Sequence, residues 1–257
     1  MDKIKVIFNA DDFGLTKGVN LGIIETVQNG PVRSTTIMAG ADEFDHAVRL
    51  SQENPSLGVG IHLTLTAISS VGGVYKTLTD KRGKLLPLRE FEQRVRAGAL
   101  DLEEVEAELE AQIQKVIASG INPSHFDSHH HVHQLPGILC MVHQLAKKYG
   151  VDKIRMWETR LLKGQFAHLQ TTAHFEDGFY GEGVCVGNLK RLLRNFKGSS
   201  KGNSIEIMVH PAYGDSVLPE ISSYNQRRRL EKDILISEEL RDFLKHGNYE
   251  VIAFSDL

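Results

Sequence analysis

Short apolar runs alternate along the chain with longer segments of helical periodicity. The short runs of β type predict strands near residues 4–10, 35–39, 58–65, 125–128, 153–157, 205–210 and 250–254. Between them, apolar residues that recur at three- and four-residue steps predict helices near residues 17–28, 44–53, 102–119, 137–149, 188–195 and 223–245. This alternation is typical of a parallel sheet built from βα units.

Seven or eight such units in 257 residues predict an α/β fold, a TIM-like (β/α) barrel that is distorted or seven-stranded. The active site of such a barrel lies at the carboxyl ends of its strands. Polar residues at predicted strand ends are therefore the candidates for chemistry.

The whole chain, residues 1–257, is expected to form one domain, since no linker, repeat or low-complexity tract interrupts the pattern. The segment near residues 67–100 lacks clear periodicity and contains Gly72, Gly73, Gly83 and Pro87, which predicts a loop insertion after the third strand. Loops of this length usually form lids or binding surfaces. A second irregular stretch covers residues 171–187.

Composition narrows the class of protein. The chain has 30 Lys+Arg against 33 Asp+Glu, a formal net charge of −3 and 41% apolar residues. These values are ordinary for a globular protein and exclude collagen-like, coiled-coil and disordered classes. Because nucleic acid and anionic lipid attract proteins with a clear excess of Lys and Arg, neither is an expected partner.

The cysteines and the apolar segments predict the cellular compartment. Cys140 and Cys185 form no CxxC pair, so a disulfide framework or zinc ribbon is not indicated. The apolar run at residues 6–8 is too short for a signal peptide, and no segment approaches the ~20 apolar residues of a membrane helix. We expect a cytoplasmic protein with no membrane partner.

Histidine is the unusual residue: the chain has 12, and four of them fall within residues 128–133. Imidazole is the commonest metal ligand in proteins, and a nearby carboxylate typically fixes its tautomer. If the chain is extended here, Asp127, His129, His131 and His133 lie on one face and His130 on the other. The alternative interpretation is an exposed histidine-rich loop.

Other predicted strands also end in polar residues. Asp11 and Asp12 follow the first strand, and adjacent buried carboxylates repel each other unless a cation or a proton separates their roles. His62 lies near the end of the third strand, and His210 precedes Pro211 at the end of another. Each also has a structural interpretation: one Asp as a helix cap, His62 as a core residue and His210 as a cap.

We expect these four strand ends to meet on one face of the barrel. One Asp and two His from different strands can bind a divalent ion and leave positions open for water and substrate. Such an ion polarises a carbonyl and lowers the pKa of water, while a carboxylate takes the proton and a His returns it to a leaving amine. The pattern therefore predicts amide hydrolysis.

At these residues the sequence resembles the YdjC-like carbohydrate deacetylases, the family that includes the chitooligosaccharide deacetylases. The resemblance spans nearly the whole chain, through residues 9–14 (NADDFG), 60–62 (GIH), 125–133 (HFDSHHHVH) and 210–212 (HPA). It implies a (β/α) barrel of the glycoside hydrolase or deacetylase type that removes acetyl groups from amino sugars with one divalent metal ion, held by Asp12, His62 and His129. It further implies that Asp11 is the general base and His210 the general acid.

The remaining residues of the histidine run have less definite roles. Asp127 is expected to orient a histidine or to contact a water, and His131 and His133 are candidates to line the sugar site. The metal is also open, because imidazole ligands favour Zn, Mn, Co or Ni, whereas the resemblance implies Mg.

The expected partner is a small acetylated oligosaccharide, chitobiose-like, with or without a phosphate. Residues of the long loops are candidates to contact its sugar rings: Tyr75, Arg155, Trp157, Phe179 and Tyr180. A homodimer is a further expectation.

Two other functions stay open. One is a different metal-dependent barrel hydrolase, a phosphoesterase or an amidohydrolase; an amidohydrolase would place a His-x-His pair where Asp11 and Asp12 stand. The other is a non-catalytic metal- or sugar-binding protein, for which His62 and His210 would be dispensable. The basic run at residues 227–229 is followed by Glu231 and Asp233, which predicts a solvated helix face.

Overall fold

The sheet of the protein is parallel and curled. The computed structural model describes residues 2–157, 166–198 and 202–257. The strands are β1 (Ile4–Phe13), β2 (Ser34–Ile37), β3 (Gly58–Leu63), β4 (Phe126–Ser128), β5 (His174–Glu176), β6 (Ser204–Val209) and β7 (Tyr249–Val251). Their order is β4-β3-β2-β1-β6-β5, and β7 pairs with the beginning of β1.

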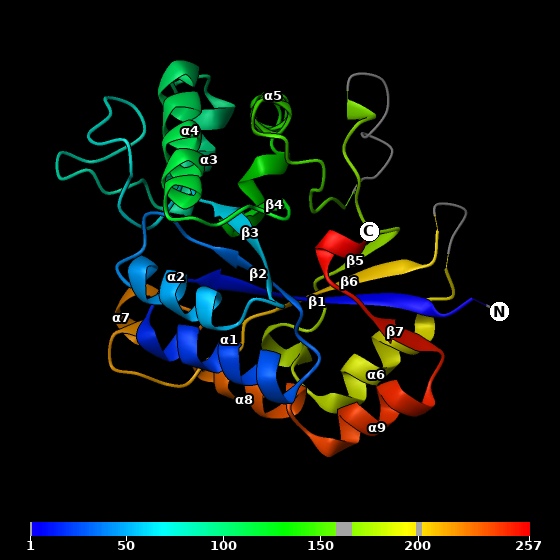
Figure 1. The fold of residues 1–257 in the computed structure, drawn as a ribbon. Coiled ribbons are helices and arrows are strands. Elements are labelled where there is room, and N and C mark those ends of the chain that lie inside the picture. The colour runs from blue at the N-terminus through cyan, green and yellow to red at the C-terminus, as the bar shows by residue number, and fades with distance from the viewer. Residues whose placement is uncertain (1, 158–165, 199–201) are drawn as a thin grey trace.

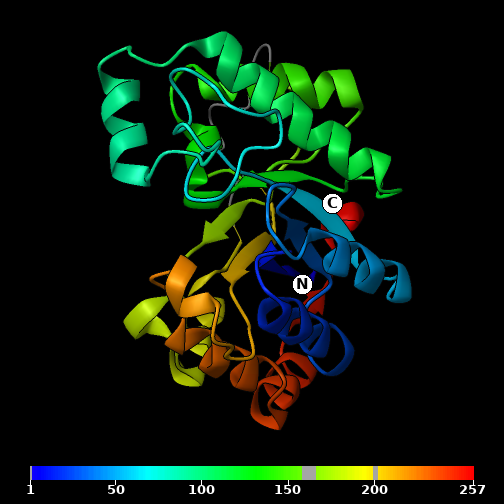
Figure 2. The ribbon, with the colours of Figure 1, turned by 90° about the vertical axis from the view of Figure 1, so that its left-hand side faces the viewer.

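Helices cover this sheet on two sides (Figures 1 and 2). On one side lie α3 (Leu88–Arg96), α4 (Leu102–Ala118) and α5 (Ile138–Tyr149). On the other lie α1 (Lys17–Asn29), α6 (Val186–Asn195), α8 (Gln226–Leu235) and α9 (Glu238–His246), with α2 (Phe44–Glu53) beside α1 and the short α7 (Leu218–Ile221) near the beginning of α1. The curled half-barrel confirms the predicted distorted TIM-like α/β fold.

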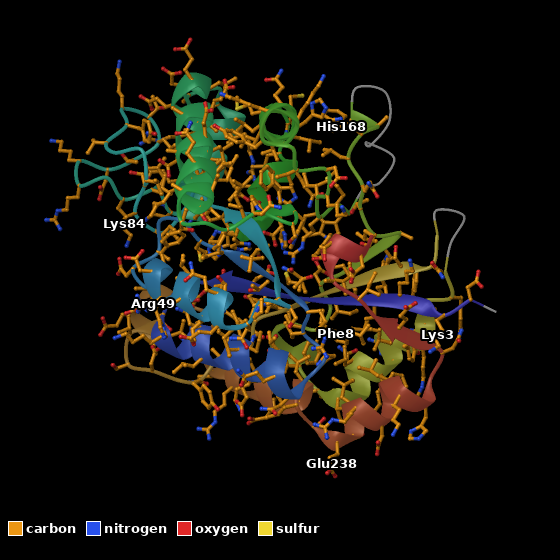
Figure 3. The ribbon with its side chains drawn as sticks, viewed as in Figure 1. Lys3, Phe8, Arg49, Lys84, His168 and Glu238 are labelled. Carbon is orange, nitrogen blue, oxygen red and sulfur yellow. The ribbon has the colours of Figure 1, made fainter. Side chains whose placement is uncertain are left out.

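The central strand β1 is buried along most of its length. Its last eight residues are all buried, as expected for a parallel strand with helices over both faces. Figure 3 shows Phe8 of β1 inside the molecule, whereas Lys3, Arg49 and Glu238 lie at its periphery.

Some elements differ from the sequence-based expectation. The predicted helix at 223–245 is two helices, because the hydroxyl of Ser237 accepts a hydrogen bond from the Leu240 amide and starts α9 anew. The predicted strand at 153–157 is reduced to isolated bridges at Lys153 and Ile154. The irregular stretch at 171–187 contains β5, whose three residues are too few to show a pattern.

The segment after β4 is not extended, so the predicted alternation of its histidines is wrong. Strand β4 ends at Ser128, and His129–Gln134 form a 3₁₀ turn. His130 and His131 have φ values of 54° and 56°, in the left-handed region. The turn reverses the chain at the strand end instead of sending alternate side chains to two faces.

The insertion near residues 67–100 is held against α4 by two carboxylates and contains α3. Glu104 accepts hydrogen bonds from the amides of Lys76 (2.9 Å) and Thr77 (2.7 Å). Glu108 accepts from the amides of Val71 and Gly72, both at 2.8 Å. These bonds fix the path of a segment that has little regular structure of its own.

Cys140 and Cys185 are both free. In the part of the chain that the structure describes, none of the helices combines the length and apolarity needed to cross a membrane.

Candidate active site

A cavity of about 930 Å³ lies at the carboxyl ends of the strands. Asp11, Asp12, His62, His129 and His210 all line it, so the structure brings together the candidates from four strand ends. The insertion contributes Lys84 and its neighbours to one wall, and the segment before α8 contributes another. This is the end of a (β/α) fold at which enzymes of this architecture carry their active sites.

Backbone strain is concentrated at the same cavity. Within the described ranges, four residues other than glycine have positive φ values: Asp12 (69°), Ala67 (72°), His130 and His131. All four line this cavity. Such conformations cost free energy and cluster where a site needs a side chain held in one direction.

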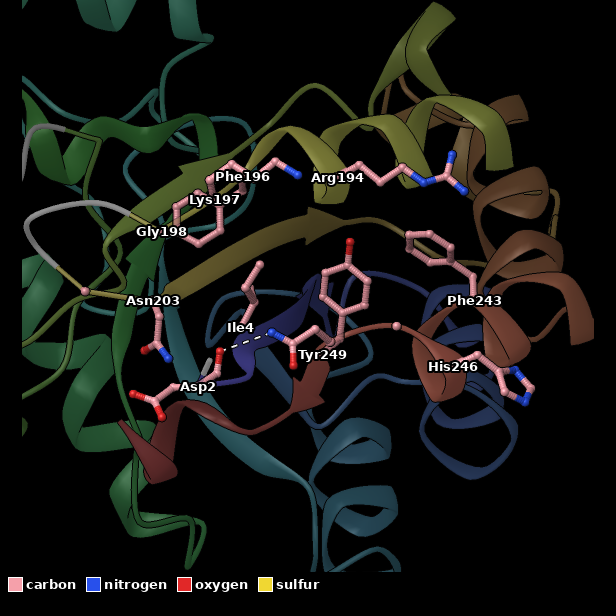
Figure 4. A pocket seen from close by; sticks show the side chains of 13 residues that line it. Asp2, Ile4, Arg194, Phe196, Lys197, Gly198, Asn203, Phe243, His246 and Tyr249 are labelled. Atoms are coloured by element: carbon pink, nitrogen blue, oxygen red, sulfur yellow. Dashed lines mark hydrogen bonds between the residues drawn. The ribbon is translucent and has the colours of Figure 1, made fainter.

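A second cavity, of about 970 Å³, lies at the opposite end, around the amino ends of β1, β6 and β7 (Figure 4). Aromatic and basic side chains such as Phe243, Tyr249 and Arg194 line it, and the Asn248 amide donates to the Asp2 carbonyl. Among the described residues, two groups could hold a metal ion, Asp12 with His62 and His129, and Asp11 with His62 and Asp127; all of these residues except Asp127 line the first cavity.

Asp12, His62 and His129 form a compact group of potential metal ligands, called the ligand set below. Asp12 Oδ1 lies 3.3 Å from His62 Nε2 and 3.1 Å from His129 Nδ1. One potential ligand atom from each of the three residues lies within 4.8 Å of the others. Asp12 Oδ1 is thus buried between two imidazole nitrogens. One carboxylate oxygen and two imidazole nitrogens are suitable donors for a divalent cation.

Asp127 and Thr36 fix the orientation of His62. His62 Nδ1 donates to Asp127 Oδ1 at 2.8 Å, and the Thr36 hydroxyl donates to Asp127 Oδ2 at 3.0 Å. Strands β3 and β4 place His62 opposite Asp127, so the sheet register creates this contact. With Nδ1 used in this way, Nε2 is directed at Asp12.

Electrostatics hold a proton on His62 in the absence of a cation. Burial alone would lower the pKa of His62, but Asp127 and Asp12 raise it to about 10. Burial alone would raise the pKa of Asp12, but Arg228 and His129 hold it well below its usual range. The positive charge of protonated His62 therefore lies beside the negative charges of Asp12 and Asp127.

Asp11 is held by Arg155. The Arg155 guanidinium donates to both oxygens of Asp11 at 2.6 and 2.7 Å, and Asn9 Nδ2 donates to Oδ1 at 2.8 Å. Arg155 also pairs with Glu206 at 2.7 Å and with Asp127 at 2.9 Å. All four side chains are buried, and Arg155 is the cation that the three carboxylates share.

His210 follows β6 directly and is held through its backbone. Its amide donates to Glu231 Oε2 at 2.5 Å, and the Tyr224 hydroxyl donates to the other oxygen of Glu231. The imidazole Nε2 lies 4.0 Å from Asp11 Oδ2. Burial and the nearby Arg228 lower the pKa of His210 to about 4, so the ring is neutral at rest.

Arg228 corrects the prediction that residues 227–229 form a solvated helix face. Arg229 is exposed, but Arg228 is 1% exposed and donates to Asp12 Oδ2 at 2.6 Å. The signal was available in the spacing, because Arg228, Glu231 and Leu235 recur at three- and four-residue steps and all are buried. The buried face of α8 is thus partly charged, and it carries the two residues that contact Asp12 and His210.

The other histidines of the run have different positions. His133 is buried and is not among the residues lining the cavity: Ser128 Oγ donates to its Nδ1 at 2.5 Å, and its Nε2 donates to the Arg155 carbonyl at 2.8 Å. His131 lines the cavity with its ring against Trp157 and Phe175. His133 instead supports the backbone of Arg155.

The residues predicted to contact sugar rings also differ in their exposure. Arg155 and Phe179 are fully buried, so the prediction that they contact a sugar from a loop is wrong. Tyr180 is 43% exposed and lines the cavity, stacked on Tyr224. Trp157 is half-exposed beside His131.

The fold and the site are those of a barrel-type enzyme. Carboxylates and histidines gather at the strand ends, and some of them form a candidate metal centre. The model of the YdjC-like protein family matches residues 5–246, and the chain belongs to this family. The resemblance found in the sequence is thereby confirmed.

Relatives and a solved structure agree with this assignment. The chain is 41% identical over 256 residues to carbohydrate deacetylase 1 of Listeria innocua, with 99% of this chain and 100% of that protein covered. It is 40% identical over 261 residues to a carbohydrate deacetylase of Brevibacillus brevis, with 99% and 100% covered. A crystal structure from Enterococcus faecalis, described as a cellobiose-phosphate cleavage protein, matches with a TM-score of 0.88 at 30% identity, covering 100% of this chain and 99% of that one.

Proposed function

We propose that the protein is a metal-dependent carbohydrate deacetylase that acts on chitobiose-like amino-sugar oligosaccharides. The names of the relatives support sugar deacetylation. The observation that carries the proposal is the placement of Asp11 beside the Asp12, His62 and His129 set, with His210 across the same cavity. This arrangement offers a base, a candidate cation site and a proton donor to one amide.

Asp12, His62 and His129 would hold the divalent ion. The buried Oδ1 of Asp12 supports this assignment, because a carboxylate oxygen that lies between two imidazole nitrogens suits a cation. A bound ion would polarise the acetamide carbonyl and lower the pKa of a water. Magnesium follows from the family resemblance, whereas the two imidazoles also suit Zn, Mn or Co.

Asp11 accepts the proton of the attacking water in this proposal. The water oxygen bonds to the acetyl carbon, the carbon–nitrogen bond breaks, and the sugar amine receives a proton from His210. Because His210 is neutral at rest, the proton that it delivers must reach it during the reaction. Asp11 Oδ2, 4.0 Å from His210 Nε2, is the proposed source. The products are acetate and the free amine.

The cavity walls suit a short sugar. Tyr180 offers an exposed ring beside His210, and Lys84, from the insertion, offers a cation to a substrate phosphate. We further propose a cytoplasmic location, in keeping with two free cysteines. The homodimer expected from the sequence stays a prediction, and light scattering after size-exclusion chromatography tests it.

Acetate release tests the proposed function. After chelation, di-N-acetylchitobiose and its phosphate are supplied with Mg²⁺, Zn²⁺, Mn²⁺ or Co²⁺ in turn, and acetate is assayed. We expect activity to disappear on chelation and to return with at least one of these ions. A protein that releases no acetate from any N-acetylated amino sugar is not a carbohydrate deacetylase.

Metal binding is expected to become tighter as pH rises. His62, whose pKa is about 10 without a cation, must lose the Nε2 proton to become a ligand, so each bound ion releases a proton near neutral pH. The expected gain in affinity is about tenfold per pH unit for each proton released. Calorimetry in two buffers of different ionisation enthalpy counts the protons. An affinity that does not change with pH would contradict the role of His62.

Removing the Glu231 carboxylate is expected to lower kcat by about tenfold, because the His210 amide and the Tyr224 hydroxyl lose their buried acceptor. Glu231→Gln, which keeps one acceptor oxygen, should retain more activity than Glu231→Ala, with KM nearly unchanged in both. Glu238→Ala, on the exposed start of α9, is the control. Equal turnover in all four proteins would exclude a positioning role.

A further inference from the structure

Arg228 has one guanidinium nitrogen that no described residue uses. Nε donates to the Tyr224 carbonyl at 2.7 Å, and Nη2 donates to Asp12 Oδ2 at 2.6 Å. Nη1 is buried and has no partner in the described part of the chain. A buried cationic donor without an acceptor is costly, so its retention calls for a ligand.

The position of Arg228 indicates which ligand. It lines the cavity together with Asp12 and His210. Asp12 Oδ1 lies there between the His62 and His129 nitrogens, and His210 Nδ1 is buried without a hydrogen bond from the described residues. A cationic donor and an imidazole nitrogen thus stand without partners at a cavity that also holds an anionic oxygen, as expected where a polar substrate group binds.

We propose that Arg228 is a catalytic residue that binds the acetyl carbonyl oxygen of the substrate through Nη1. This inference rests on the proposed deacetylase function and deepens it. The two Nη atoms are the ends of one planar fork, so the bond from Nη2 to Asp12 keeps Nη1 beside the ligand set. The acetamide that reacts between Asp11 and His210 presents its oxygen to this region.

The proposed contact strengthens as the reaction proceeds. When the water oxygen bonds to the acetyl carbon, the electron pair of the C=O double bond moves to the carbonyl oxygen, which becomes negative. The Nη1–H group donates to that oxygen. When the carbon–nitrogen bond breaks, the double bond re-forms and the amine takes the proton. Arg228 stays protonated throughout, since a guanidinium does not lose its proton in proteins.

The test separates binding to substrate from support of Asp12. Arg228→Lys keeps a positive charge near Asp12 but has no second fork nitrogen. We expect its kcat to fall by about 10²-fold with KM changed less than about threefold, as for the loss of a donor to a developing oxyanion. Affinity for Mg²⁺ or Zn²⁺, measured by calorimetry, should stay within about threefold of wild type. Arg229→Lys, an exposed neighbour on α8, is the matched control.

Chemical rescue gives a second signature. Methylguanidinium is expected to raise the turnover of Arg228→Ala, whereas methylammonium is not, because only the first supplies a fork of donors. A kcat of Arg228→Lys within threefold of wild type overturns the inference. A loss of kcat matched by an equal loss of metal affinity also overturns it, since Arg228 would then act only through Asp12.

The wild-type protein provides a test that does not depend on folding of the variants. In a crystal soaked with acetate and the metal, Nη1 of Arg228 should lie within hydrogen-bond distance of an acetate oxygen. Acetate bound away from Arg228 overturns the inference. Failure of the wild type to release acetate overturns the proposed function and this inference with it. An active wild type with an unaffected Arg228→Lys variant overturns this inference alone.

Discussion

Replacing Asp11 by asparagine should lower kcat for acetate release by about 10³-fold, within the range found for loss of a general base. Asparagine has nearly the same shape but cannot accept the proton of the attacking water. Asp11 is not in the set formed by Asp12, His62 and His129, so affinity for the divalent ion should change little. Acetate release and calorimetry on the same preparation measure both quantities.

The adjacent carboxylate supplies the matched control. Asp12→Asn should lose metal affinity as well as turnover, because Asp12 Oδ1 is the oxygen between His62 and His129. The two neighbouring substitutions are therefore expected to give different results. If Asp11→Asn keeps its turnover, Asp11 is not the base, and if it loses metal affinity, its role is that of a ligand.

Replacing Arg155 by methionine is expected to have the largest effect on stability. Three buried carboxylates, those of Asp11, Asp127 and Glu206, would lose their common cation. Removal of one partner from a buried ion pair costs about 3–5 kcal/mol. At 2–4 °C per kcal/mol for a protein of this size, the melting temperature should fall by roughly 10 °C. Arg49→Met, at an exposed position, should leave it nearly unchanged.

The pH dependence of this effect has a definite sign. Burial raises the pKa of Asp11 and Arg155 lowers it, with a net decrease, so in the wild type the pair stabilises the fold above the unfolded pKa of about 4. Without Arg155, burial is expected to raise the pKa of Asp11, and ionisation then opposes folding. The stability deficit of Arg155→Met should therefore shrink as pH falls from about 7 to 4. A deficit that is the same at both pH values would show that lost packing, not charge, is the cause.

The part of the site that local sequence could predict is the part located at strand ends. Asp11, Asp12, His62 and His210 each follow or close an apolar run, and a polar residue in that place is visible without knowledge of any partner. The same reasoning predicted their convergence, because parallel strands present their carboxyl ends at one edge.

The partners of those residues were not predictable in this way. Arg155 and Asp11 are 144 positions apart, and Arg228 and Asp12 are 216 apart, so the sequence near either arginine does not indicate its partner. Arg228 also lies among charged neighbours that suggest an exposed face. The contact depends on packing of α8 beside α1 under the end of β1, which is a tertiary property.

The backbone conformation after β4 is the reason that the alternation predicted for the histidine run is wrong. Alternation along an extended chain assumes that the strand continues, but β4 ends at Ser128 after three residues. His130 and His131 then adopt left-handed conformations, which are uncommon for residues other than glycine. Only the surrounding packing, including the buried bonds of His133 to Ser128 and Arg155, selects this turn.

The contacts between α4 and the insertion imply that the insertion tolerates sequence change better than the strand ends do. Glu104 and Glu108 bind main-chain amides, which every residue except proline possesses. Side chains of the insertion can therefore be exchanged without loss of the bonds that keep this cavity wall in place. The strand-end residues have no such freedom, because each acts through its own side chain. Random mutagenesis confined to the insertion should thus yield variants with altered sugar preference at intact catalytic power more often than mutagenesis of the barrel.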